Sequence, residues 1–380
     1  MDFRLDSEHE ELVELYRQFA QQEVKPLAAE VDSTERFPRE TVEKMAEMGM
    51  LGIPFPEEWG GAGMDNLSYA QCVEELAKVC ATTAVIVSAH TSLCAWPIYN
   101  FGTEEQKKKY LPGLCSGELL GAFGLTEPGA GTDAAGQLTT AVDCGDHWLI
   151  NGSKIFITNA GEADVYVIFA MTDKSKGNRG ITSFILEKDT PGFSIGKHEE
   201  KMGIRGSATC ELIFEDVKLP KENLLGELGK GFKVAMATLD GGRIGIAAQA
   251  LGIAEGAIEE TINYVTQRTQ FGKRISEFQN TQFELAQMKA NTEAARLLVY
   301  RAANAKDNGE PYSQYAAMAK LFAARNASDV TRRCLQLFGG YGYTREYPME
   351  RMMRDAKITE IYEGTSEVQM MVISSWMGVK

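Results

Sequence analysis

The sequence predicts an α+β fold in which a β region lies between two helical regions. Apolar residues recur at helical spacing before Gly121, short strand-like runs follow it, and long amphipathic stretches run from Gly231 to the end. We therefore expect an N-terminal α-helical domain at residues 1–120, a middle antiparallel β domain at 121–230 and a C-terminal α domain at 231–380.

Two capping-box patterns indicate helix starts in the N-terminal region. The first is Ser7-Glu8-His9-Glu10, and it precedes Leu12, Tyr16 and Phe19, which share one face of a helix. The second is Thr103-Glu104-Glu105-Gln106. In each box a side-chain oxygen is expected to accept a free backbone N–H of the first helical turn.

Proline and glycine indicate the breaks between these helices. Pro38 suits the first turn of a second helix, and Pro112 is expected to follow the helix that begins near Thr103. The segment Gly52–Asp65 is rich in glycine and proline and is predicted to be a loop. A further helix is expected over about Leu67–Lys78.

The middle region has the two-residue period of strands. Asn151-Gly152 separates two apolar runs, Trp148–Ile150 and Ile155–Ile157, and this pattern predicts a hairpin turn. The apolar run Val165–Ala170 suits a buried strand, and Thr209–Val217 alternates apolar and charged residues.

The C-terminal region returns to the helical period. Ile244–Ile258 is apolar on most sides, which is typical of a buried helix. Two long amphipathic helices are expected at Glu284–Ala305 and Tyr312–Leu337, and Gly339–Gly342 ends the second.

Composition excludes several classes of function. The formal net charge of −14 argues against nucleic acid and anionic membranes as partners. The acidic N-terminus lacks a signal peptide's apolar stretch, and the most apolar segment, Ile244–Ala254, is too short to span a bilayer, so we expect a cytoplasmic protein. The seven scattered cysteines predict free thiols. No metal site is expected, because no metal-ligand spacing joins His9, His90, His147 and His198.

Two motifs of the middle region have the composition of a cofactor site. The loop Leu125–Asp133 combines two glycines with the hydroxyls of Thr126 and Thr132, and could grip a phosphate or the edge of a flat heterocycle. Further on, Phe156 and Thr158 would point to the same side of a strand and could cover a flavin ring. The alternatives are a polar turn and ordinary core packing, which are the commoner meanings of such patterns.

Two motifs of the C-terminal region also allow two interpretations. In Arg268–Arg274, Arg268 could bind a pyrophosphate and Phe271 could stack on an adenine, or the run could be a solvated helix end. Ser366 and Gln369 resemble a capping box, which places Glu363 in the loop just before a helix. A carboxylate there is either a catalytic group or a solvated charge.

Taken together, these motifs resemble the acyl-CoA dehydrogenase family, and within it the bacterial short-chain, butyryl-CoA-type enzymes. The resemblance covers essentially the whole chain. It is carried by TEPGAGTD at 126–133, RTQFGKRISEFQ at 268–279, QLFGGYGY at 336–343 and IYEGTSE at 361–367. The family fold places a β domain between two α domains, the second resembling a four-helix bundle, with FAD between them.

The resemblance implies which residues bind FAD. Contacts to the flavin or its ribityl chain are expected from Phe123, Leu125, Thr126, Gly131 and Thr132. Phe156 and Thr158 would lie against the isoalloxazine ring, with Thr158 near its reactive nitrogen N5. Further FAD contacts are implied at Thr365 and Glu367. Residues that would reach the FAD of a neighbouring subunit are Arg268, Gln270, Phe271, Ile275 and Gln279, with Gln336 and Gly340 near its adenine end. The family is usually tetrameric, so a homo-oligomer is expected.

The resemblance also implies the chemistry. Glu363 matches the family's base, which removes the α proton of an acyl-CoA while the β hydrogen leaves as hydride to FAD. The substrate-binding positions implied are Thr132, Asp240, Arg243, Tyr362 and Gly364. The thioester oxygen would accept bonds from a ribityl hydroxyl and from the Glu363 N–H, each worth roughly 3 kcal/mol. The electrons would pass to an electron-transferring flavoprotein, and butyryl-type enzymes can also run in reverse.

Several positions differ from the common family pattern. Phe156 stands where tryptophan is more frequent, Thr132 where serine is, and Glu367 where glutamine is. One branch of the family carries its base near the position of Gly241-Gly242, and glycine cannot act as a base, so this chain falls outside that branch.

Other functions remain open at this stage. An acyl-CoA oxidase would pass electrons to oxygen, but its chains are typically much longer. Branched, aryl or dicarboxylic acyl groups are alternatives to a short straight chain. A flavin-binding module without catalysis is the alternative from another class, and the presence of Glu363 argues against it.

Overall fold

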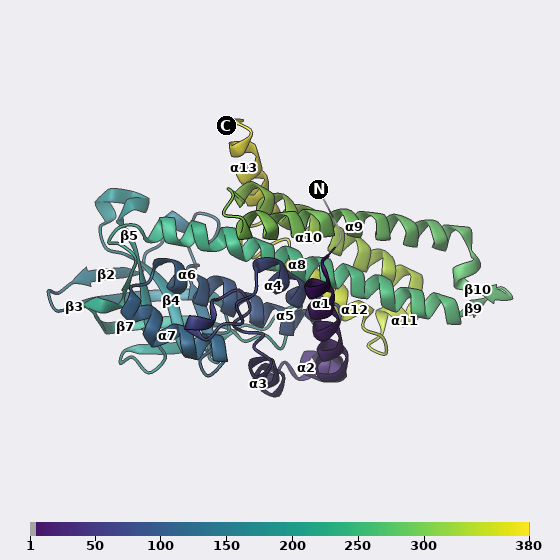
Figure 1. Cartoon of the computed structure of the whole chain (residues 1–380), viewed down its shortest axis with the longest axis horizontal. Helices are drawn as coiled ribbons and strands as arrows, with labels where there is room; N and C mark the ends of the chain where they lie inside the picture. The colour runs from purple at the N-terminus through teal and green to yellow at the C-terminus, as the bar shows by residue number, and fades with distance from the viewer. Residues whose placement is uncertain (1–4, 380) are drawn as a thin grey trace.

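The computed structural model describes residues 5–379, so Met1–Arg4 and Lys380, which fall in the predicted terminal domains, lie outside the described residues. Helices at both ends of the chain flank a sheet, and the long helix α8 (Gly231–Gln267) runs from the sheet towards the opposite end of the molecule (Figure 1). The predicted order of helices, strands and helices is confirmed.

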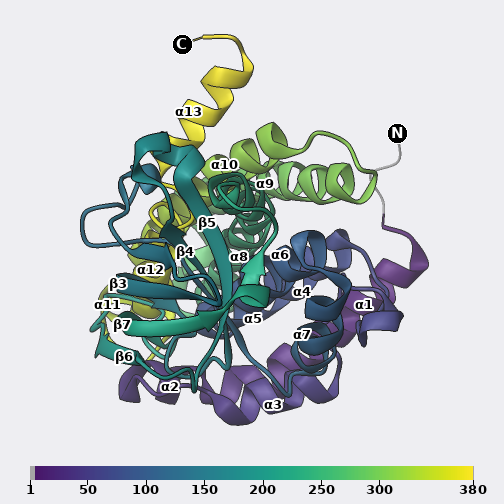
Figure 2. The same cartoon turned by 90° about the vertical axis from the view of Figure 1, so that its left-hand side faces the viewer.

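The N-terminal region consists of helices on one side of α8, as Figure 2 shows from the end of the sheet. These helices are α1 (Ser7–Phe19), α2 (Ala28–Thr34), α3 (Arg39–Glu47), α4 (Asn66–Ala77), α5 (Ala81–Ser88), α6 (Trp96–Phe101) and α7 (Glu104–Ser116). A π-helical segment, Ala89–Ala95, joins α5 to α6.

Of the two predicted capping boxes, one is present and the other is not. The Thr103–Gln106 box is present with both of its hydrogen bonds. The first box is wrong, because α1 is capped by Asp6, whose Oδ1 accepts the N–H of His9 at 3.0 Å. Pro112 was expected beyond α7 but lies inside it. A proline removes only one helix bond, and α7 continues for one more turn before Gly117.

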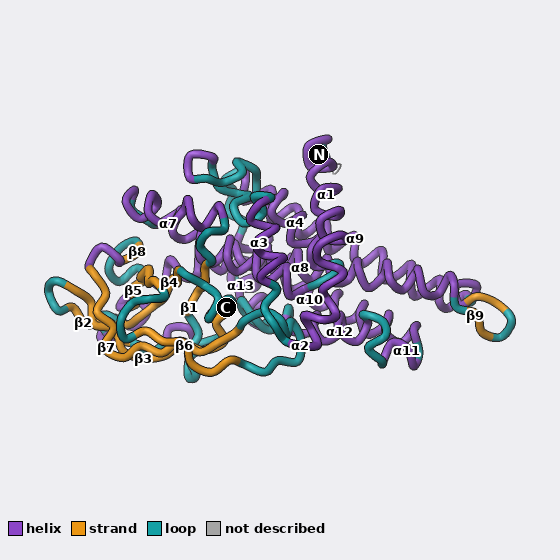
Figure 3. The backbone as a smooth tube through the Cα atoms, turned by 90° about the horizontal axis from the view of Figure 1, so that it is seen from below, coloured by secondary structure: helices purple, strands orange, loops and turns teal. Residues whose placement is uncertain are grey.

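The middle region forms a sheet (Figure 3), and most of its strand pairs are antiparallel. The strand order is β6-β7-β3-β2-β4-β5-β8, with β1 added beside β4. The strands are β1 (Gly121–Gly124), β2 (Thr140–Asp143), β3 (His147–Thr158), β4 (Val165–Met171), β5 (Ile181–Glu187), β6 (Phe193–His198), β7 (Thr209–Pro220) and β8 (Leu224–Leu225). The sheet departs from the prediction in that β1 pairs with β4 in parallel, and β2 meets β4 in parallel through one residue pair. The intervening strands β2 and β3 provide the crossover that a parallel pair needs.

The predicted hairpin at Asn151-Gly152 is wrong. Both residues lie inside the continuous strand β3, where a register shift against β7 occurs between Ile150 and Gly152. Gly152 has φ +142°, and a Cβ there would come within 2.6 Å of Thr139 Oγ1. Glycine is therefore required here by a β-bulge and by the close approach of Thr139, not by a turn.

Helix α8 forms the centre of the C-terminal region and is buried along most of its length. Close approach of α4 requires glycine on one face of α8, since a Cβ would lie 2.2 Å from Glu74 O at Gly252 and 2.1 Å from Lys78 O at Gly256. The remaining helices are α9 (Gln279–Asp307), α10 (Ser313–Phe338), α11 (Gly340–Tyr343), α12 (Met349–Ile358) and α13 (Ser366–Trp376). The short strands β9 (Thr269–Gln270) and β10 (Lys273–Arg274) form a hairpin between α8 and α9, at the end farthest from the sheet (Figure 1).

A buried histidine ties the N-terminal helices to the sheet. His90 Nε2 lies 2.9 Å from Leu114 O, and its Nδ1 accepts the N–H of Gly121 at the start of β1. Burial lowers the pKa of His90 to about 4, so the imidazole is neutral at physiological pH and can accept that bond.

Residues 5–379 contain neither a membrane-spanning helix nor a cluster of metal-binding side chains. No helix in this range is both long and apolar enough to cross a membrane. Over the same range, no three side chains of the metal-binding types come together as a site. All seven cysteines are unpaired, and all but Cys144 are buried.

Candidate active site

A cavity of about 660 Å³ lies where the middle and C-terminal regions meet. Its walls come from the β1–β2 loop, the end of β3, α8 and the loop between α12 and α13, with the π-helical segment closing one side. The predicted site residues that line it are Phe123, Leu125, Thr126, Gly131, Thr132, Phe156, Thr158, Arg243, Tyr362, Glu363, Gly364 and Thr365. Residues far apart in the sequence therefore share one space.

Glu363 lies in the loop before α13, as its position in the sequence predicted. Its backbone adopts the left-handed conformation, with φ +52°, and Gly364 follows with φ +96°. The Oε2 atom of Glu363 is inaccessible to solvent and has no hydrogen-bond partner within residues 5–379. Burial raises the pKa of this carboxyl to about 7, against the opposing charges of Lys320 and Arg243. A carboxyl with such a pKa can take up a proton at neutral pH.

The start of α13 corrects one further prediction. The helix is capped by Thr365, whose Oγ1 accepts the N–H of Val368 at 3.4 Å. Ser366, the predicted cap, is instead buried, and its hydroxyl has no partner in the described chain. The cap shifts by one residue because the left-handed Glu363-Gly364 pair turns the chain before the helix begins.

Arg243 brings a positive charge to the wall of the cavity. It lies on α8 with Asp240, and its Nη1 donates to Asp240 Oδ1 at 2.5 Å. Ser313 donates a further hydrogen bond to the same oxygen, at 2.9 Å. Arg243 Nε is inaccessible and unpaired within residues 5–379, so Asp240 does not saturate the five N–H donors of the guanidinium. Asp240 holds Arg243 but does not itself line the cavity.

Phe156 and Thr158 both line the cavity, but not by simple strand alternation. The register of β3 against β7 shifts between Lys154 and Ile157, and Phe156 has φ +60°. As a result Ile157, which strand alternation would point to the opposite side, lines the cavity as well. Phe156 is 59% exposed, so its ring is free to lie against a ligand in the cavity.

A buried ion pair beneath the loop was missed by the sequence analysis. Lys154 is fully buried on β3, and its Nζ donates to Glu127 Oε1 at 2.7 Å, to Gln137 Oε1 at 3.1 Å and to Leu125 O at 3.2 Å. Glu127 also accepts the backbone N–H of Leu138. Burial lowers the pKa of Lys154 to about 8. The pair fixes both ends of the loop that carries Thr126 and Thr132. Its only signal in the sequence is a lysine inside an apolar strand.

We expect Lys154→Met to lower the free energy of unfolding by about 3–5 kcal/mol, because it leaves the buried Glu127 carboxylate without its cation. The flavin content of the purified protein should fall with it, since the loop loses its anchor. Chemical unfolding and absorbance at the flavin band measure the two effects. The matched control is Lys218→Met, an exposed lysine of β7, which should change stability by less than about 0.5 kcal/mol. Equal stability of the two variants would show that the ion pair is dispensable.

The remaining predicted residues lie away from the cavity. Glu367 is exposed on the first turn of α13, where backbone N–H and Thr365 hydrogen bonds lower its pKa. The others lie near the β9–β10 hairpin and the end of α10, where Arg268 sits 5.4 Å from the ring of Tyr341. These residues are Arg268, Gln270, Phe271, Ile275, Gln279, Gln336 and Gly340. Within one chain they take no part in the cavity.

Comparison with known proteins identifies the family. Three family models match the chain: the acyl-CoA dehydrogenase N-terminal domain at residues 6–118, the middle domain at 122–217 and the C-terminal domain at 229–378. A short-chain specific acyl-CoA dehydrogenase of Clostridium acetobutylicum is 63% identical over 98% of this chain and 99% of its own.

Solved structures agree. The butyryl-CoA dehydrogenase of Megasphaera elsdenii superposes with a TM-score of 0.98 at 55% identity, covering 99% of this chain and 100% of that one. A chain from the structural study of the electron transferring flavoprotein of Acidaminococcus fermentans gives 0.98 at 57% identity, covering 99% of both. The chain belongs to the acyl-CoA dehydrogenase family.

Proposed function

We propose that this chain catalyses the FAD-dependent α,β-dehydrogenation of butyryl-CoA to crotonyl-CoA, or the reverse reaction, and exchanges electrons with an electron-transferring flavoprotein. The observation that carries the proposal is the buried carboxyl of Glu363, whose Oε2 has no partner within residues 5–379, in the wall of the cavity. The predicted flavin contacts line the same cavity, except Glu367 and the residues near the β9–β10 hairpin and the end of α10, which we call the distal residues. The identity of 63% to a short-chain specific relative supports the choice of acyl group.

The residues present fit a flavin. An exposed aromatic ring at Phe156, apolar side chains at Phe123 and Leu125, and the hydroxyls of Thr126 and Thr158 suit a flat heterocycle with polar edges. The glycine at 131 has nothing within 4 Å of an added Cβ, so the backbone there is open to a ligand. A flavin held by these residues would supply a hydride acceptor.

The chain's own part is proton transfer and orientation. Glu363 would take the α proton at its carboxylate, and its pKa of about 7 is near the most effective value for a base at neutral pH. Arg243 lines the cavity and would bind the CoA moiety, and so hold the α carbon beside the carboxylate. The backbone N–H of Glu363 would stabilise the negative charge that develops on the thioester oxygen.

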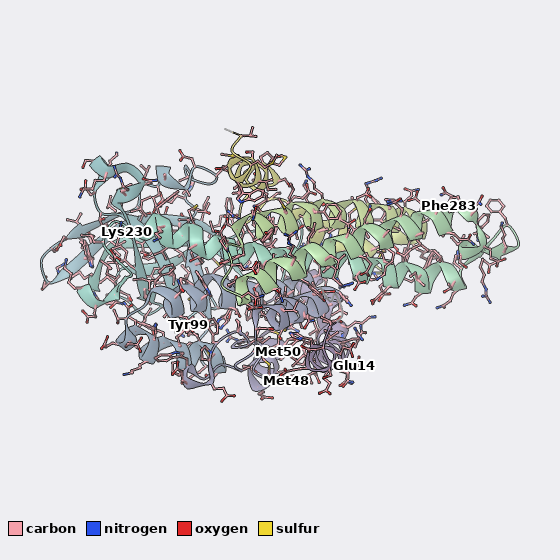
Figure 4. The ribbon with its side chains drawn as sticks, turned by 45° about the horizontal axis from the view of Figure 1, so that its top comes forward. Glu14, Met48, Met50, Tyr99, Lys230 and Phe283 are labelled. Atoms are coloured by element: carbon pink, nitrogen blue, oxygen red, sulfur yellow. The ribbon has the colours of Figure 1, made fainter. Side chains whose placement is uncertain are left out.

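We further propose a homotetramer in which the distal residues complete the cofactor site of a neighbouring subunit. Large apolar side chains are exposed at that end, among them Phe271, 94% exposed, and Phe283, 63% exposed. Figure 4 shows Phe283 at the end of the molecule opposite Lys230. Exposed apolar surface of this kind is typical of subunit interfaces. A cytoplasmic location is supported by the unpaired cysteines.

The proposal is tested by titrating the purified protein anaerobically with butyryl-CoA and following the flavin absorbance, beside longer, branched and aryl acyl-CoAs. We expect the flavin band to bleach most strongly with butyryl-CoA. Bleaching by another acyl-CoA alone would change the substrate but keep the reaction. A yellow protein that no acyl-CoA bleaches would be a flavin-binding module, and a protein that cannot be loaded with FAD would refute both.

A further inference from the structure

Lys320 places a buried ammonium group directly behind the loop that carries Glu363. It lies on α10 and its side chain is fully buried. Its Nζ donates to the carbonyl oxygen of Gly364 at 2.6 Å. Burying an ammonium group is unfavourable unless partners compensate for the lost water, so a lysine at such a position calls for a reason.

The backbone that Lys320 holds is strained. Glu363 has φ +52°, a conformation that costs a residue with a Cβ about 1 kcal/mol or more and that persists only where the surroundings enforce it. Two side chains do so here. Gln369 of α13 donates from Nε2 to the carbonyl oxygen of Gly364 at 2.8 Å. Lys320 of α10 donates to the same oxygen. Together they fix the Gly364–Thr365 peptide, and Gln369 Nε2 also donates to Glu363 O, in the peptide that follows Glu363, at 3.4 Å.

The positive charge of Lys320 is not needed for this hydrogen bond. The neutral amide of Gln369 already satisfies the Gly364 carbonyl, and one partner is enough for a buried oxygen. Burial lowers the pKa of Lys320 to about 8, whereas the carboxylate of Glu363 raises it, so the ammonium form prevails at neutral pH. The other charged groups that act on Lys320 are Arg243, Glu360 and Glu367.

We propose that Lys320 is a positioning residue for proton abstraction: it holds the left-handed backbone of Glu363 through the Gly364 carbonyl, and its charge keeps the Glu363 carboxylate ionised and ready to accept the α proton. The inference rests on the proposed function of Glu363 as the base. It assigns two separate roles, a hydrogen bond that orients and a charge that tunes, and these can be measured apart.

The test compares flavin-loaded Lys320→Met with Gln369→Leu, which removes the neutral donor to the same oxygen. Turnover and KM for butyryl-CoA are measured across the pH range with an artificial electron acceptor. We expect Lys320→Met to lower kcat roughly 10- to 100-fold, because the carboxylate is misplaced, with KM changed only a few-fold. The acid limb of kcat/KM should move up by about one pH unit, since the base loses a neighbouring positive charge. In Gln369→Leu, kcat should fall while the acid limb stays in place.

An unmoved acid limb in Lys320→Met would overturn the proposal and leave Lys320 as a structural donor only, and so would an unchanged kcat. If Lys320→Met fails to load flavin, Lys320→Gln tests the role of the charge. This variant keeps a hydrogen-bond donor but lacks the charge, so the acid limb of its kcat/KM profile must still move. If neither variant yields loaded protein, Lys320 is a folding residue and the proposal is wrong. Bleaching of the wild type by butyryl-CoA, and its loss in Glu363→Gln, report on the proposed function alone.

Discussion

Glu363→Gln is expected to lose at least about a hundredfold of the turnover with butyryl-CoA while keeping its fold and its FAD. The substitution replaces one carboxylate oxygen by an amide nitrogen and keeps the shape of the side chain. It removes the buried carboxylate of the cavity to which we assign the α proton. General bases contribute about 10²–10⁴-fold to rate, so the loss should fall in kcat rather than in KM. Steady-state kinetics and the flavin spectrum of the purified variant measure both.

The control for this variant is Glu310→Gln. Glu310 is an exposed carboxylate in the loop between α9 and α10, and it is remote in sequence from the cavity-lining residues. The same chemical change there should leave turnover within about twofold, as for most surface substitutions. If Glu363→Gln turned over butyryl-CoA at the rate of Glu310→Gln, another residue would have to be the base.

Much of the fold follows from local patterns in the sequence. The helical period predicts α8, α9 and α10, and the Thr103–Gln106 pattern predicts the cap of α7, because capping and amphipathicity depend on residues a few positions apart. The position of Glu363 just before α13 follows in the same way, although the capping residue is Thr365 rather than Ser366.

The errors arise where distant segments decide the local structure. Asn151-Gly152 has the composition of a hairpin turn, but β2 and β7 pair with β3 on its two sides and keep the strand continuous through a bulge. Local turn preference is worth little against two ladders of hydrogen bonds. The Lys154–Glu127 pair joins residues 27 positions apart, and no spacing rule connects them. The cavity itself depends on the approach of α8 to the α12–α13 loop, which only tertiary packing determines.

Gly242→Ala is expected to lower turnover roughly 10- to 100-fold and to change stability much less, because the gain in helix propensity opposes the cost of displacing Leu93. A Cβ at position 242 of α8 would lie 2.0 Å from Glu363 Oε2 and 2.8 Å from Leu93 Cδ2. The carboxylate must therefore move, and a displacement of about 1 Å in a reacting group can cost about 10²-fold in rate. Alanine favours a helix interior over glycine by about 1 kcal/mol, so the stability of α8 should not fall for reasons of backbone conformation. Turnover and thermal unfolding, measured on the same flavin-loaded samples, separate the two effects.

The neighbouring position supplies the matched control. At Gly241 an added Cβ would meet only the tip of Lys306, with Nζ at 3.2 Å, and the hydroxyl of Tyr312 at 3.8 Å. A lysine tip can move away, so Gly241→Ala should retain most of the activity. Equal turnover in the two variants would show that the Glu363 carboxylate does not depend on the space at Gly242. A selective loss in Gly242→Ala would explain in steric terms why a base in the α12–α13 loop requires glycine at this point of α8: a side chain at 242 and the Glu363 carboxylate compete for the same volume.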